Sequence, residues 1–223
     1  MDDSSKKLAH AFLDGDIHAS WMIVQQHVNE GMNSYYIYEQ LLTPAMHYIG
    51  ELWEKNEITV ADEHIATGVC DFILSRYSFQ FVQQNKAEKQ KRAIFFCLEG
   101  EEHYLGIKMV SALFQEEGWD VRFLGPNLPL EYMLYTVQNF KPEVVGISLS
   151  LSTQLPQLKD YLHVLEEQKE SLTILVGSRI GPSIDTNFIL SKSVQFIYSL
   201  QEIRMWFEKE TLQTNEEEEV IWI

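Results

Sequence analysis

Residues 93–106 read A-I-F-F-C-L-E-G-E-E-H-Y-L-G: an apolar run, a polar turn and the beginning of a second apolar pattern. The run at 93–98 predicts a buried strand, and residues 104–117 have the periodicity of a helix. A strand followed directly by a helix is the repeating unit of parallel α/β sheets. We therefore expect the polar turn at the carboxyl end of a strand, where such folds bind ligands.

The same alternation continues to residue 209. Apolar strand patterns recur at 121–124, 144–148, 173–176 and 195–198, and helical patterns lie at 129–139, 156–169, 181–190 and 200–209. Five strands with crossover helices predict a parallel, doubly wound sheet. This α/β domain is expected over 93–209, with an acidic, mobile tail over 210–223.

The N-terminal part has no strand pattern. Residues 4–82 predict four helices with short connections, which favours a four-helix bundle. Ser34 is expected to cap the third helix, Pro44 to kink it, and Thr59 with Asp62 to form a capping box for the fourth. We expect a helical domain over 1–84 and a charged linker over 85–92.

Charge and composition exclude several classes of protein. There are 17 Lys and Arg against 33 Asp and Glu, a net charge of −16 that disfavours direct nucleic-acid binding. The two cysteines, Cys70 and Cys97, are too few for a disulfide framework or a thiolate metal site. No signal peptide or membrane-spanning run is present. We expect a cytoplasmic protein.

His103 is the first candidate for metal ligation. A neutral imidazole at this edge, with Glu101 two residues earlier, suits a metal ligand, because the carboxylate can take the other ring N–H and fix the tautomer. Gly106 allows a bulky planar ligand close to the helix start. The alternative is a solvated histidine beside acidic neighbours.

The spacing around His103 resembles the cobalamin-binding signature of methionine synthases, mutases and corrinoid proteins, D-x-H-x-x-G followed by S-x-L and G-G. Glu101-x-His103-x-x-Gly106 matches the first element with Glu for Asp. Residues 107–147 give a gap of 41 before Ser148-Leu-Ser150, and residues 151–176 a gap of 26 before Gly177-Ser178. The departures are Ser for Leu at 150 and Ser for Gly at 178.

This resemblance implies a Rossmann/flavodoxin-like domain that binds cobalamin with the nucleotide base displaced from cobalt. It implies His103 as the lower cobalt ligand. The other cofactor-binding residues that it implies are Glu101, Gly106, Ser148, Ser150, Gly177 and Ser178.

The helical part resembles the cap of cobalamin-dependent photoreceptor regulators. The stretch L-W-E-K-N-E-I-T-V-A-D-E-H holds Trp53, Val60, Glu63 and His64 in the W-x9-E-H spacing of that family. The resemblance implies that Trp53 covers the upper face, Val60 and Glu63 lie at an adenosyl group, and the cofactor is adenosylcobalamin, with methylcobalamin as the alternative. Glu54 stands where some members have a second cobalt-binding histidine. The alternative for Trp53 and Val60 is a place in the bundle core.

Three functions remain open. We expect a light- or cobalamin-responsive sensor without enzymatic activity, acting on transcription through a protein partner such as a DNA-binding protein. Photoreceptor regulators usually carry a winged-helix domain that this sequence lacks, so either that domain has been removed or a partner replaces it. The alternatives are a corrinoid methyl carrier of a methyltransferase system and a cofactor-free scaffold. The sequence leaves homo-oligomer formation open.

Overall fold

The computed structural model describes residues 2–82, 91–168, 172–178 and 193–220. The chain divides into two compact units. Residues 1–87 with 115–117 form the first, here called the helical unit, and the remaining residues form the second, the sheet unit. Each unit is described by itself.

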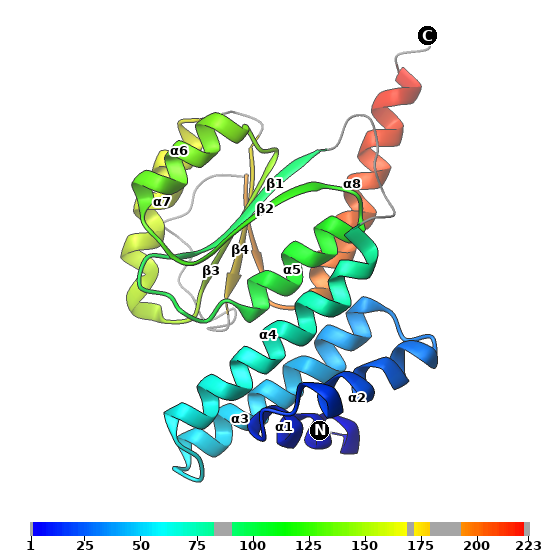
Figure 1. Ribbon diagram of the computed structural model, residues 1–223. Helices are drawn as coiled ribbons and strands as arrows, with labels where there is room; N and C mark the ends of the chain where they lie inside the picture. The colour runs from blue at the N-terminus through cyan, green and yellow to red at the C-terminus, as the bar shows by residue number, and fades with distance from the viewer. Residues whose placement is uncertain (1, 83–90, 169–171, 179–192, 221–223) are drawn as a thin grey trace. The chain divides into compact units, whose positions relative to one another are not determined.

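The helical unit is a four-helix bundle, as predicted (Figure 1). Its helices are α1 (Asp3–Leu13), α2 (Ile17–Asn29), a π-helical segment η1 (Tyr36–Leu42) that continues into α3 (Thr43–Glu54), and α4 (Val60–Val82). Apolar side chains at helical spacing meet in a core that is closed to solvent, including Leu8, Phe12, Val24, Ile37, Leu41, Ile49, Ile73 and Leu74.

The helix ends confirm one predicted cap and correct another. Asp62 Oδ2 accepts from the backbone N–H of Thr59 at 2.8 Å, and the Thr59 hydroxyl accepts from the N–H of Asp62 at 3.3 Å, which is the predicted capping box. The cap predicted at Ser34 belongs instead to Asn33, whose side chain accepts from Tyr36 N at 3.0 Å. The buried hydroxyl of Ser34 lies 3.0 Å from the hydroxyl of Tyr77.

Pro44 lies where the π-helical segment η1 meets α3. Proline has no N–H, so Pro44 cannot donate to the carbonyl of Gln40, four residues earlier. The buried hydroxyl of Ser5, on α1, donates to that carbonyl at 3.1 Å. The wider π turns before Pro44 and a hydrogen bond from a neighbouring helix thus accommodate the proline within the helical run.

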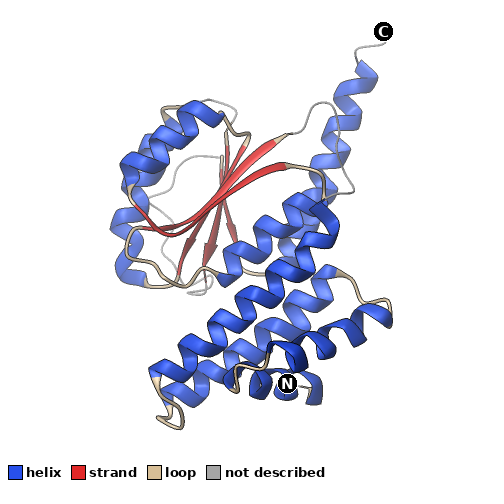
Figure 2. Cartoon of the chain, viewed as in Figure 1, coloured by secondary structure: helices blue, strands red, loops and turns tan. Residues whose placement is uncertain are grey.

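The sheet unit contains five parallel strands in the order β2-β1-β3-β4-β5 (Figure 2). The strands are β1 (Arg92–Leu98), β2 (Asp120–Leu128), β3 (Val144–Leu149), β4 (Thr173–Ser178) and β5 (Val194–Ile197). The connecting elements are α5 (Leu105–Glu116), α6 (Leu130–Phe140), a 3-10 turn η2 (Ser152–Gln154), α7 (Leu155–Glu166) and α8 (Leu200–Val220). This is the predicted doubly wound fold, and the strand order reverses between β1 and β3.

Helices cover both faces of the sheet (Figure 1). On one face, Ile94, Phe96 and Ile147 pack in a core with apolar residues of α6 and α7. On the other face, the ring of Phe95 meets that of Phe114 of α5, and Phe114 in turn packs on Trp206 and Phe207 of α8. Gly146 lies beside Phe95, where an added Cβ would come within 2.2 Å of the ring. The sheet therefore requires glycine at position 146.

Some predicted boundaries differ from the structure. β2 extends to Leu128, well beyond the predicted end at residue 124, and Arg92, expected in the linker, begins β1. The stretch from residue 210, expected to be a mobile tail, is helical as far as Val220 because α8 continues through it. The predicted helix at 181–190 and most of the predicted linker lie outside the described residues.

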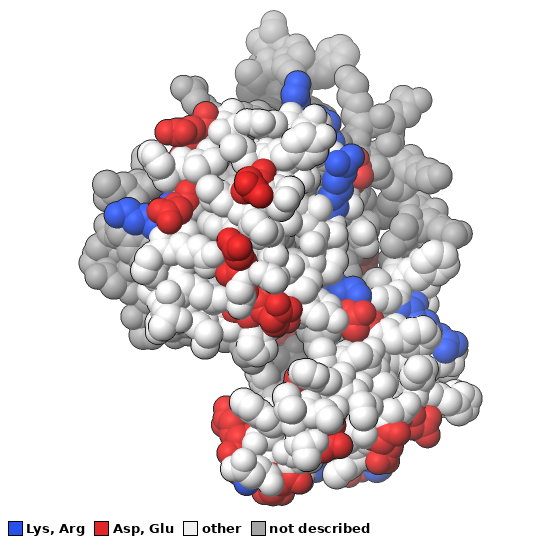
Figure 3. Space-filling view, turned by 60° about the vertical axis from the view of Figure 1, so that its left-hand side comes forward, with Lys and Arg blue, Asp and Glu red and all other residues white. Residues whose placement is uncertain are grey.

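Acidic side chains outnumber basic ones on the face shown in Figure 3, as the net charge of −16 requires. Among the described helices, none is both long enough and apolar enough to cross a membrane.

Candidate functional site

The turn between β1 and α5 brings Glu101 and His103 together. The turn begins with Gly100 at φ 80°, a left-handed conformation that favours glycine, and the N–H of Glu101 donates to the Leu98 carbonyl at 2.9 Å. Glu101 is 2% exposed, and its Oε1 accepts from the backbone N–H of His103 at 2.8 Å. The same oxygen lies 2.6 Å from Nδ1 of His103.

This contact decides which ring nitrogen of His103 is available. An ionised carboxylate only accepts, so Nδ1 carries a hydrogen, and in the neutral ring this leaves the lone pair on Nε2. The His103 side chain is 62% exposed. A neutral imidazole with one free nitrogen, oriented by a buried carboxylate, is the arrangement of a metal ligand with its supporting residue.

Ser150, in the loop after β3, holds the second oxygen of Glu101. Its backbone N–H and its hydroxyl both donate to Oε2, at 2.6 and 2.5 Å. Burial alone would raise the pKa of Glu101, but the hydrogen bonds from Ser150 and His103 outweigh it, so the pKa lies below its ordinary value. The carboxylate is therefore charged while almost fully buried.

Gln154 was not among the predicted site residues. Its Oε1 accepts from the backbone N–H groups of Ser150 and Leu151, at 3.2 and 3.1 Å, and this fixes the loop after β3. Gln154 belongs to a loop-to-helix pattern that carries no metal-binding signal by itself, so the sequence alone could not single it out.

Cys97, Ser148 and Gly177 lie in register on the adjacent strands β1, β3 and β4. Side chains alternate along a strand, and their neighbours Phe96 and Ile147 face α6 and α7, so these three positions face the side of α5 and α8. Among the described residues, an added Cβ at Gly177 would meet only the Ile147 carbonyl oxygen, at 3.8 Å, and one at Gly106 would meet nothing within 4 Å. Neither glycine therefore presents a side chain that would obstruct a ligand there.

The four candidate residues of the helical unit flank one interhelical loop. Trp53 lies at the end of α3 and is 49% exposed, and Val60 begins α4 and is 55% exposed. Glu63 accepts from the hydroxyl of Thr67 at 2.8 Å, and Nε2 of the exposed His64 lies 3.8 Å from its other oxygen. Trp53 and Val60 are therefore not part of the bundle core.

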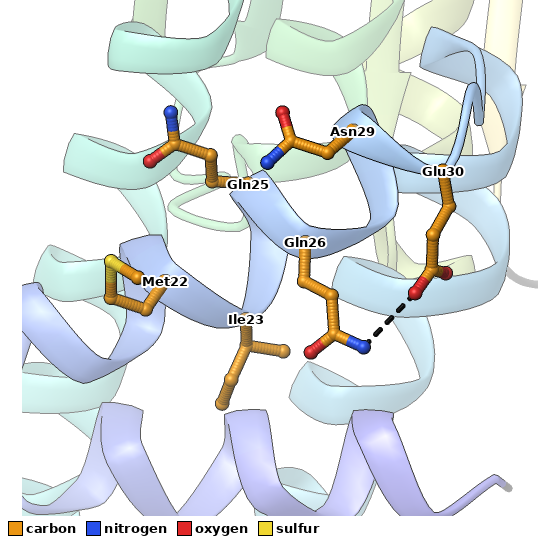
Figure 4. Close-up of a pocket in the computed structure, with 6 residues that line it drawn as sticks. All are labelled: Met22, Ile23, Gln25, Gln26, Asn29 and Glu30. Carbon is orange, nitrogen blue, oxygen red and sulfur yellow. Dashed lines mark hydrogen bonds between the residues drawn. The ribbon is translucent and has the colours of Figure 1, made fainter.

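A shallow hollow lies elsewhere on the helical unit, along α2 (Figure 4). It is lined by Met22, Ile23, Gln25, Gln26, Asn29 and Glu30, with Gln26 donating to Glu30 at 3.0 Å. None of the predicted site residues lines this hollow. We therefore do not assign the cofactor to it.

The fold and the Glu101–His103 pair define a class of protein: a helical bundle and a doubly wound domain whose first strand leads into a turn with a carboxylate-oriented histidine. Two family models, both described as B12 binding domain, match residues 5–77 and 91–200. Together they span both units. The chain belongs to the B12-binding family, and it binds cobalamin.

Similar proteins include corrinoid proteins and a transcriptional repressor. A corrinoid protein of Desulfitobacterium hafniense is 22% identical over 79% of this chain and 83% of its own. The HTH-type transcriptional repressor CarH of Myxococcus xanthus is 25% identical over 66% of this chain, which spans 48% of that repressor. The monomethylamine corrinoid protein of Methanosarcina barkeri has the same fold, with a TM-score of 0.68, 20% identity, and coverage of 90% of this chain and 94% of its own.

Proposed function

We propose that this protein is a cobalamin-dependent sensor that prefers adenosylcobalamin and acts through a protein partner. His103 binds cobalt from below in place of the cofactor's own base. Trp53, Val60 and Glu63 form the pocket for the upper ligand, with His64 at its margin. Photoreceptor and transcription-regulating roles are part of this proposal.

The observation that carries the proposal is the exposure of Trp53 and Val60. Apolar side chains of this size at helix ends ordinarily contribute to the core, and here about half of each is open to solvent. Glu63, one helical turn after Val60, has its carboxylate held by Thr67. An apolar surface with one oriented acceptor matches the chemistry of an adenosyl group, which offers a flat base to an indole and hydroxyls to a carboxylate.

The lower side of the proposed site rests on the turn after β1. With Nδ1–H donated to Glu101, the free Nε2 can bind cobalt. Glu101, Ser148, Ser150, Gly177 and Ser178 lie at the carboxyl ends of β1, β3 and β4, or directly after them. We assign the nucleotide tail to this edge, next to Gly177, which has no side chain to obstruct it. Adenosylcobalamin supplies a light-sensitive cobalt–carbon bond when bound.

The second candidate is a corrinoid methyl carrier, which would work with a methyltransferase rather than as an enzyme by itself. It is favoured by the similarity to the corrinoid protein of Desulfitobacterium hafniense and by the fold shared with the monomethylamine corrinoid protein. The resemblance to CarH favours the sensor. A methyl group is far smaller than an adenosyl group, so the two candidates differ in what the upper pocket must hold.

The test is reconstitution of the full chain in the dark with adenosylcobalamin and, separately, with methylcobalamin. The sensor predicts at least about tenfold tighter binding of the adenosyl form, equivalent to about 1.4 kcal/mol, and a lasting change of absorption after green light. Equal affinities, or tighter binding of methylcobalamin, would favour the methyl carrier. Failure to bind either form would contradict both candidates.

A further inference from the structure

Asn127, near the end of β2, has a left-handed backbone conformation in a strand that borders the site. Pairing between β1 and β2 is regular from Arg92 to Phe95 and then shifts. Between the pairs Phe96–Gly125 and Leu98–Leu128, β2 contains one residue more than β1, which is a β-bulge. Bulges next to functional sites commonly redirect a side chain.

The bulge directs Asn127 toward the metal-ligand turn. Its side-chain Oδ1 accepts from the backbone N–H of Gly100 at 2.8 Å, and its own N–H donates to the backbone carbonyl of Glu101 at 3.0 Å. Asn127 therefore fixes the two peptide groups on either side of the Gly100–Glu101 peptide, at the start of the turn that leads to His103. These two hydrogen bonds come from the neighbouring strand β2, and not from β1 or α5, between which the turn lies.

The conformation of Asn127 restricts which residues can make both hydrogen bonds. Its φ is 55°, in the left-handed region that asparagine, aspartate and glycine tolerate best. The bond to Gly100 requires an acceptor one carbon beyond Cβ, which glycine lacks. Asparagine and aspartate both tolerate this conformation and carry a side-chain oxygen on Cγ, so they meet both requirements.

We propose that Asn127 is a positioning residue for His103. It acts through Glu101: by fixing the backbone at 100 and 101, it sets the place of the carboxylate that orients the imidazole. The contacts of that carboxylate lie at 2.5–2.8 Å, so a displacement of the turn by a few tenths of an ångström weakens them. This inference rests on the proposed lower ligation of cobalt by His103.

The experiment compares Asn127→Gly, which keeps the left-handed backbone but removes the acceptor, with Asn127→Asp, which keeps both. Lys141→Gly is the matched control, since Lys141 also has a left-handed φ of 52° but lies at the end of α6. The probe is cobinamide, a corrin without a nucleotide base, so that only the protein can supply a nitrogen below the metal. Affinity is measured by absorption, and nitrogen coupling by electron paramagnetic resonance of the cobalt(II) form.

Asn127→Gly should stay folded, with an unfolding midpoint equal to or above that of wild type, because glycine relieves the left-handed strain. It should bind cobinamide about 10–100-fold more weakly and show reduced nitrogen coupling. Asn127→Asp should retain most of the cobinamide affinity and most of the nitrogen coupling. Lys141→Gly should match wild type in both measurements. Wild-type affinity and coupling in Asn127→Gly would overturn the proposal, as would equal losses in the Gly and Asp variants.

His103→Ala separates this inference from the proposed function. Nitrogen coupling in wild type that disappears in His103→Ala supports lower ligation whatever Asn127 does. Coupling that is absent from wild type, or unchanged in His103→Ala, overturns the lower ligation and with it the role of Asn127.

Discussion

Oε1 of Glu101 lies 2.6 Å from Nδ1 of His103, yet only 2% of the glutamate is exposed, whereas 62% of the histidine side chain is. The pair thus joins a fixed, charged interior group to a ring that projects into solvent. Ser150 secures the other carboxylate oxygen from a different strand end. The orientation of the ring therefore depends on two loops that are 49 residues apart in the chain.

Replacing Glu101 by Gln should weaken cobalamin binding about 10–100-fold, as changes to the support of a metal ligand commonly do. The amide has the same shape as the carboxylate but no charge. Its N–H₂ group cannot accept from the donors of His103 or Ser150 that lie on that side. Glu102→Gln is the matched control, because Glu102 is exposed and adjacent. Affinity is measured by spectral titration. Equal losses in the two variants would indicate a general charge effect instead.

Trp53→Ala should reduce the preference for adenosylcobalamin over hydroxocobalamin by about 5–30-fold, which corresponds to about 1–2 kcal/mol for a stacked indole. The unfolding midpoint should change little, because Trp53 is half exposed. Phe79→Ala removes an exposed aromatic ring far along α4 and serves as the control. An unchanged affinity ratio in Trp53→Ala would remove Trp53 from the upper pocket.

Glu54→His should increase the cobalt retained after illumination. Glu54 ends α3 next to Trp53, and a carboxylate binds cobalt(III) less well than an imidazole does. Wild type should therefore lose more cobalamin when the illuminated holoprotein is desalted. Cobalt is quantified in the protein fraction of both forms. Complete retention by wild type would contradict this prediction and point to another ligand, such as His64.

Cys97 should make the protein less stable at high pH. Burial, with a smaller contribution from Glu101 and Glu102, raises the pKa of its thiol to about 12 from 9.0. The folded state then holds a proton that the unfolded state releases between these values. Stability should therefore fall by about 1.4 kcal/mol per pH unit as the pH rises through this window.

Cys97→Ala should remove this slope, although it lowers the free energy of unfolding at every pH by leaving a small cavity. Urea unfolding at several pH values between 8 and 10.5 measures both quantities. Parallel curves for wild type and variant would show that the Cys97 thiol does not carry the pH dependence.

Much of the fold follows from the sequence because its signals are local. Short apolar runs locate the five strands and period-3.6 patterns most helices, and parallel strands with crossover helices allow few topologies. The sequence does not decide between Asn33 and Ser34 as the helix cap, because both side chains can accept from a backbone N–H at a helix start. Which of them does so depends on a shift of one residue in where the helix begins. The π-helical turns before Pro44 depend on Ser5 of another helix, which no local pattern reveals.

The site was predictable to the extent that spacing encodes it. The gaps of 41 and 26 residues around Ser148 led to the strand ends where the structure places these residues. The contact of Ser150 with Glu101 could not be read from the sequence, because it requires knowing that β1 and β3 are neighbours. Asn127 was missed for the same reason, since its function depends on a bulge in β2.

The hydrogen bond from Ser5 to the carbonyl of Gln40 has a mechanical consequence. Gln40 and Trp53 belong to one continuous helical run, about 20 Å apart along its axis. A shift of that run along its axis would change the geometry at both ends at once. A partner bound to α1 and a ligand in contact with Trp53 would then both act on this helical run. Each would change the affinity of the protein for the other by the same factor.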